Sequence, residues 1–166
     1  MQGFTRITTA LAWLAAALFV AAGVMLTYEV VARYFFVRPT IWAAELSQLC
    51  LIWGSLLAMA WAMAARRHIT VTAFTSLLPE RGRAALEVFS LLAVALFSAF
   101  VAWHGWHIFL DSWVRGRTTG SLLDLPSWFS EIPVPAGFAL LFVQALIEAA
   151  RILRGEGVPT HVEPQE

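Results

Sequence analysis

Four long apolar stretches separated by short polar segments dominate the pattern of this chain. They cover residues 10–33, 42–65, 84–110 and 133–153. At about 1.5 Å per residue in a helix, each stretch is long enough to cross a hydrocarbon core of roughly 30 Å. The pattern therefore predicts an all-α integral membrane protein with four transmembrane helices, built as a single membrane domain over residues 1–166.

The segments between the stretches predict how the spans are connected. Residues 35–41 are too few for anything but a tight hairpin, so the first two spans should be antiparallel neighbours. Residues 68–78 gather apolar side chains on one side and Thr and Ser on the other, which predicts a short amphipathic helix on the cytoplasmic membrane surface. The tail, residues 155–166, is rich in proline and glutamate and is expected to be disordered.

The distribution of arginine predicts the orientation. Seven arginines belong to the N-terminus, the 66–83 loop and the C-terminal end, and the other four of the 11 basic residues lie on the opposite side. Because short cytoplasmic loops carry the excess of basic residues, both termini should be cytoplasmic. Arg66, Arg67 and His68 are then the cytoplasmic anchor of the second span.

Composition narrows the function classes. The chain is 60% hydrophobic and 13% charged, with a formal net charge of zero, so neither its charge nor a basic cluster indicates nucleic acid as a partner. Cys50 is the only cysteine, which excludes an internal disulfide and a cysteine-based metal site.

The second span carries both a polar and a small-residue feature. Glu45 is its only charged residue and lies one turn from the outer end, where interfacial water or a cation can reach it. Gly54, Ala58 and Ala62 recur every four residues and form a stripe that Ser47 joins, and such small residues let a neighbouring helix approach closely. Glu45 points away from Gly54, so this span is predicted to lie between two packing partners.

The first span ends with a possible ion pair. Glu29 and Arg33 are four residues apart, in the order that favours a helical salt bridge. The pair could simply end the helix at the membrane surface, or it could contact another subunit.

Potential catalytic chemistry is sparse. His104, His107 and Asp111 share one helix face and form either an interfacial polar cap or part of a metal site. No hydrolase elbow or phosphate-binding loop is present, and the charged residues lie toward span ends and not at mid-span, where a transport path would need them. We therefore predict no enzyme activity, no catalytic residues, no bound cofactor and no metal.

The stretch from Glu29 to Arg83 resembles the small membrane subunit (DctQ type) of tripartite ATP-independent periplasmic (TRAP) transporters. The four-span layout agrees with that family over about residues 5–155. Two positions depart from it, Ala58 where many relatives have glycine and Thr72 where aspartate is common. The resemblance is carried by Arg33-Tyr34, Pro39, Trp42, Glu45, Trp53, Arg66, His68-Ile69-Thr70-Val71 and Leu78-Pro79.

This resemblance implies a non-catalytic scaffold subunit in the bacterial inner membrane, surrounded by membrane lipids. Its partners would be a large multi-span permease, which imports an organic acid or other carboxylate with Na⁺ coupling, and a periplasmic substrate-binding protein. Two alternatives stay open, a membrane anchor subunit of a redox enzyme and an autonomous small exporter. The candidate interface or packing residues are Glu29, Arg33, Glu45, Trp53, Gly54, Ala58 and Ala62.

Overall fold

The computed structural model describes residues 2–65, 80–121 and 123–154, and the regular structure of these residues is helical. The elements are α1 (Gln2–Phe35), α2 (Trp42–Ala65), α4 (Glu80–Arg115), α5 (Trp128–Glu131) and α6 (Pro133–Leu153). Four helices, the last combining α5 with α6, are long and apolar enough to cross a membrane. The all-helical fold with four spans is thus confirmed, whereas the predicted surface helix (68–78), the anchor at Arg66, Arg67 and His68 and the predicted disordered tail (155–166) lie outside the described residues.

The helices are longer than hydropathy alone predicts at two of the four spans. α2 and α6 have the bounds of the second and fourth apolar stretches, but α1 and α4 extend beyond residues 10–33 and 84–110 at both ends. Polar residues can continue a helix past the hydrocarbon region, because the helical backbone satisfies its own hydrogen bonds on either side of the interface. Hydropathy therefore marks the membrane-embedded part and not the whole helix.

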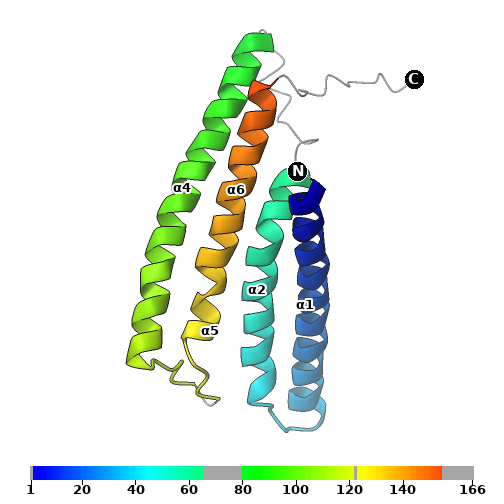
Figure 1. The fold of residues 1–166 in the computed structure, drawn as a ribbon. Coiled ribbons are helices and arrows are strands. Elements are labelled where there is room, and N and C mark those ends of the chain that lie inside the picture. Colours follow the sequence, from blue (N-terminus) through cyan, green and yellow to red (C-terminus); the bar gives the residue numbers. More distant parts are fainter. Residues whose placement is uncertain (1, 66–79, 122, 155–166) are drawn as a thin grey trace, which may run out of the picture.

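The four long helices stand in a row in the order α1, α2, α6, α4 (Figure 1). α2 packs against both α1 and α6, and α6 packs against both α2 and α4. Along the helix axes, the start of α1 and the end of α6 lie on one side of the molecule, at the top of Figure 1. The α1–α2 hairpin and α5 lie toward the opposite side, at the bottom. α2 and α6 are thus central, and α1 and α4 are the outer helices.

Small side chains on a seven-residue repeat form the contact between α1 and α2. The buried positions of α1 include Thr8, Ala15, Ala22 and Glu29, which is the spacing of a coiled-coil seam. A Cβ atom added at Gly54 of α2 would lie 3.3 Å from the Ala15 carbonyl oxygen. The two helices approach closely where Ala15 faces Gly54, and the missing side chain of Gly54 also leaves room for the Phe19 ring, 3.3 Å from the same Cβ position.

Glycine also allows close contacts between α6 and its two neighbours. A Cβ atom at Gly137 would lie 2.7 Å from the Leu56 carbonyl oxygen of α2, so at this level the backbones of α2 and α6 nearly touch. On the other side, a Cβ atom at Gly105 of α4 would lie 3.3 Å from Cδ of Pro135. Glycine is needed at Gly137 because any side chain would push the two central helices apart.

The small residues predicted on α2 do not all share one environment. Gly54 and Ser47, which belongs to the same predicted stripe, are buried, but Ala58 and Ala62 are only half-buried, whereas Leu57 is buried. Positions four residues apart drift by about 40° per step around a helix, whereas alternating steps of three and four stay on one face. The predicted stripe therefore leaves the packed seam after Gly54.

Candidate functional site

The hairpin between α1 and α2 is organised around the Glu29 carboxylate. Its side chain is 6% exposed and accepts hydrogen bonds from Arg33 Nη2 at 2.5 Å and Nε at 3.1 Å. The other carboxylate oxygen accepts from the Thr40 backbone N–H at 2.9 Å and from the Thr40 hydroxyl. Glu29 thus joins the last turn of α1 to the residue that enters α2.

The backbone of this hairpin is constrained as well. Val37 adopts a positive φ of 52°, an uncommon conformation for a β-branched residue. The Arg38 N–H donates to the Ala32 carbonyl at 3.1 Å, and the Tyr28 ring stacks on Trp42 with centroids 5.9 Å apart. These contacts hold a strained turn in place.

The Glu29–Arg33 ion pair that the sequence predicted is therefore present, and its two members differ in exposure. The Arg33 side chain is 56% exposed, in contrast to the buried glutamate. Glu29 is committed to contacts within the chain, so of the two residues Arg33 has the surface for a contact with another subunit. Their role in a subunit interface stays a prediction.

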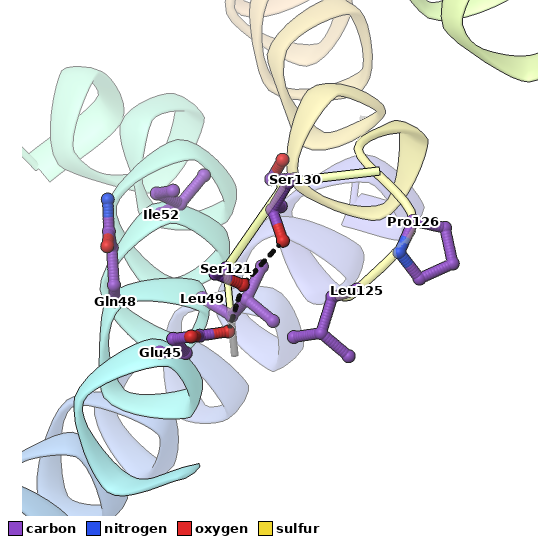
Figure 2. Close-up of a pocket in the computed structure, with 9 residues that line it drawn as sticks. Glu45, Gln48, Leu49, Ile52, Ser121, Leu125, Pro126 and Ser130 are labelled. Carbon is purple, nitrogen blue, oxygen red and sulfur yellow. Dashed lines mark hydrogen bonds between the residues drawn. The ribbon is translucent and has the colours of Figure 1, made fainter. Parts of the chain in front are cut away.

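Glu45 lies in a groove between α2 and the connection from α4 to α5. Its carboxylate accepts a hydrogen bond from the Ser121 hydroxyl at 2.7 Å (Figure 2). The groove encloses about 310 Å³, and Gln48, Thr119 and Ser130 add polar side chains to its wall. The predicted polar face of α2 therefore meets a segment about 76 positions away in the chain.

The connection is folded so that Ser121 can reach Glu45. α4 ends in a Schellman motif, in which Gly116 has φ 59° and the Arg117 N–H donates to the Ser112 carbonyl at 3.1 Å. The following residues double back, with the Thr119 N–H donating to the Leu125 carbonyl at 2.9 Å. The hydropathy pattern predicts residues 111–132 only as a polar connection between two spans and not its folding, although Gly116 marks where α4 must end.

Asp111 forms ion pairs with two arginines and not with the histidines on its helix face. Its carboxylate pairs with Arg115 Nε at 2.6 Å and with Arg117 Nη2 at 2.8 Å. The ring of His104 packs on Phe100 with centroids 4.1 Å apart, and His107 packs edge-on against Trp103. This arrangement fits the polar cap better than the partial metal site.

Trp53 connects α2 to α5. Its indole N–H donates to the Phe129 carbonyl at 3.0 Å, and the two rings lie 5.5 Å apart. The sequence singled out Trp53 only through the family resemblance, and the structure places it in a packing contact within the chain.

A polar cluster on α6 was not recognised as a unit from the sequence. Gln144 and Glu148 are buried, with the Gln144 amide donating to Glu148 at 2.9 Å and Arg151 Nη1 donating to the same oxygen at 3.1 Å. The spacing of four and three residues places all three on one face of the helix, which was the available signal. The charge of Glu148 is thereby compensated inside the protein.

Comparison with known proteins identifies the family. Residues 23–155 match the family described as tripartite ATP-independent periplasmic transporters, DctQ component. The chain is 26% identical over 147 residues to the ectoine TRAP transporter small permease protein TeaB of Halomonas elongata, covering 86% of this chain and 76% of TeaB. It is also 27% identical over 141 residues to the sialic acid TRAP transporter permease protein SiaT of Haemophilus influenzae, covering 84% of this chain but 22% of SiaT.

The family match over residues 23–155 confirms the resemblance, whose motif residues lie between Glu29 and Arg83. The matches favour a transport subunit over a redox anchor, because the matched family and both relatives are transporter permeases. The chain with its four membrane-spanning helices therefore belongs to the DctQ family of small permease subunits of TRAP transporters.

Proposed function

We propose that this chain is the non-catalytic scaffold subunit of a TRAP-type importer in the bacterial inner membrane. A large multi-span permease would carry the substrate with Na⁺ coupling, and a periplasmic binding protein would deliver it. The observation that carries this proposal is the position of the charged groups. Each described span has a long uncharged stretch. These stretches lie between Arg6 and Glu29 in α1, between Glu45 and Ala65 in α2, between Glu87 and Asp111 in α4, and between Glu131 and Glu148 in α5 and α6.

This charge distribution supports a scaffold because secondary transporters bind substrate and coupling ions near the bilayer midplane, usually at broken helices or ionisable residues. Here the helices are continuous through that region. The carboxylates toward the span ends instead form contacts within the chain, as Glu29 does with Arg33 and Glu45 with Ser121.

The proposed substrate class is an organic acid or other carboxylate. The relatives' names refer to ectoine and sialic acid, and both compounds are carboxylic acids. The choice among such substrates would be made by the binding protein and the large permease.

The proposed orientation has both termini in the cytoplasm. The start of α1 and the end of α6 lie on the same side of the molecule (Figure 1). The excess of arginine on that side supports the proposal that it faces the cytoplasm.

Reconstitution tests the proposal. The chain is affinity-purified from its native membrane with the permease that accompanies it, and uptake of radiolabelled carboxylates is measured in liposomes with a Na⁺ gradient and the binding protein. We expect uptake from the complex and none from this chain alone. Uptake by this chain alone, or full uptake by the permease without it, would refute the scaffold function.

A further inference from the structure

The exposed surface of α2 differs from that of the outer helix α4. Between Trp42 and Trp61, the exposed residues of α2 are Ala44, Gln48, Leu51 and Ser55, which follow one another at spacings of four, three and four. They therefore lie along a single face. Leu51 is the one large hydrophobic residue among them.

The outer helix α4 shows the contrasting pattern. In the middle of α4 the exposed residues include Leu96, Phe97, Phe100 and Trp103, of which Leu96 is 76% and Trp103 66% exposed. Bulky apolar side chains suit contact with lipid. A face with small residues and an amide suits contact with another helix, because small residues allow close approach and polar side chains hydrogen-bond across the interface.

Gln48 is the central feature of this face. Its side chain is exposed and forms no hydrogen bond to another residue of the described ranges, in contrast to Ser55, whose hydroxyl donates to the Leu51 carbonyl at 2.7 Å. An unpaired amide is unfavourable against hydrocarbon. A partner that supplies a donor or acceptor would remove this cost.

The face continues into the groove at Glu45, since Gln48 lines both (Figure 2). The groove residues include one carboxylate and no arginine or lysine. Its complement is a positively charged side chain, which would also bring a hydrogen-bond donor to the Glu45 carboxylate.

The size relation to SiaT points to the kind of molecule that lies here. In that permease, the region similar to this chain is 22% of one longer polypeptide, so a scaffold of this type is covalently joined to a much larger permease. α2 is a central helix, and a partner on its exposed face would contact the middle of the row.

We propose that the α2 docking surface, formed by Ala44, Glu45, Gln48, Leu51 and Ser55, binds a transmembrane helix of the large permease. That helix presents a hydrogen-bonding side chain to Gln48 and a basic side chain to Glu45. This inference rests on the proposed function and specifies which side of the scaffold meets the permease.

Site-specific photo-crosslinking in native membranes tests the assignment. A benzophenone amino acid replaces Gln48 or Ser55, and in matched controls Leu96 or Trp103 of α4. We expect adducts with the large permease from the two α2 positions and lipid adducts alone from α4. Permease adducts from α4, with lipid adducts alone from α2, would overturn the inference.

Affinity purification of the unmodified chain distinguishes a failure of the proposed function from a failure of the proposed docking surface. If no large permease is recovered, the proposed function itself is refuted. If the permease is recovered but crosslinks through α4, the scaffold function stands and the docking surface is wrong.

Two substitutions measure the polar contacts. Glu45→Gln and Gln48→Leu should each lower recovery of the permease about tenfold, because each leaves a buried polar partner uncompensated. Leu96→Ala, on the face assigned to lipid, should leave recovery unchanged. Recovery equal to that of the unmodified chain from both α2 variants would contradict the proposal.

Discussion

Glu29 and Arg33 form one ion pair, yet the protein depends on them unequally. Glu29 also accepts two hydrogen bonds from Thr40 and is nearly inaccessible, whereas more than half of the Arg33 side chain is exposed. Removing Glu29 would leave the half-buried Thr40 donors without an acceptor, but removing Arg33 would leave a carboxylate that still has Thr40.

We therefore expect Glu29→Ala to destabilise the folded chain by about 1–3 kcal/mol and Arg33→Ala by about 1 kcal/mol or less. Cys50 is the only cysteine and is half-buried, so a thiol-reactive dye in detergent reports thermal unfolding. An equal loss from the two substitutions would show that the ion pair, and not the Thr40 contacts, stabilises the hairpin.

Glycine at position 137 is required by a backbone contact, whereas glycine at position 23 is not. Gly137→Ala would place Cβ 2.7 Å from the Leu56 carbonyl oxygen, but a Cβ at Gly23 meets nothing within 4 Å. The first substitution should destabilise the chain by about 1–3 kcal/mol through overpacking. Gly23→Ala should be neutral or stabilise it by up to about 1 kcal/mol through helix propensity. The same thiol assay compares them, and a neutral Gly137→Ala would mean that α2 and α6 are not packed this closely.

Among the elements, α2 connects the two halves of the molecule. It packs along α1, contacts α6 at Leu56, and binds the loop after α4 through Glu45 and α5 through Trp53. The short helix α5 has little buried surface of its own, since none of its residues is buried. Its position therefore depends on its neighbours, on α4 through the packing of Trp128 against Trp113 and on α2 through the hydrogen bond from Trp53.

Trp53→Phe should loosen α5 and the connection before it. The substitution keeps an aromatic ring but removes the N–H that donates to the Phe129 carbonyl, a bond worth about 1 kcal/mol. We expect faster trypsin cleavage after Arg115 and Arg117, both of which are exposed. Trp61→Phe, at an exposed position of the same helix, is the control and should leave the cleavage rate unchanged. An unchanged rate in Trp53→Phe would show that Glu45 and Ser121 suffice to hold the connection.

For the whole molecule, the row of helices has two broad faces and little interior. In the open row the central helix α2 keeps an exposed face from Ala44 to Ser55, so its polar groups are available to a partner without any change in the fold (Figure 1). This shape suits a subunit that widens a larger membrane assembly.

Orientation can be tested at the same scale. Single cysteines are introduced by Thr118→Cys or Gln2→Cys in a Cys50→Ser background. Position 118 belongs to the connection between α4 and α5, and position 2 to the start of α1 on the opposite side of the molecule. We expect an impermeant maleimide added outside intact spheroplasts to label position 118 and to label position 2 only after permeabilisation. The reverse labelling pattern would mean that the start of α1 faces the periplasm and the connection between α4 and α5 faces the cytoplasm.

The sequence by itself determined the number of spans, their approximate positions and the α1–α2 hairpin. The reason is that the hydrocarbon core excludes charge and sets a minimum helix length, so uninterrupted apolar stretches identify spans directly. The family was also evident from residues such as Trp42, Glu45 and Trp53, and the ion pair of Glu29 with Arg33 followed from their spacing.

The tertiary structure decided which face of each helix is packed and in what order the helices stand. In a membrane span all faces are apolar, so hydrophobicity does not distinguish the packed side, and contact is decided by side-chain size and shape. Ala58 and Ala62 resembled Gly54 in sequence but lie beside the seam and not within it. The contact of Glu45 with Ser121 likewise joins distant parts of the chain, and only the packing of α2 against α6 brings them together.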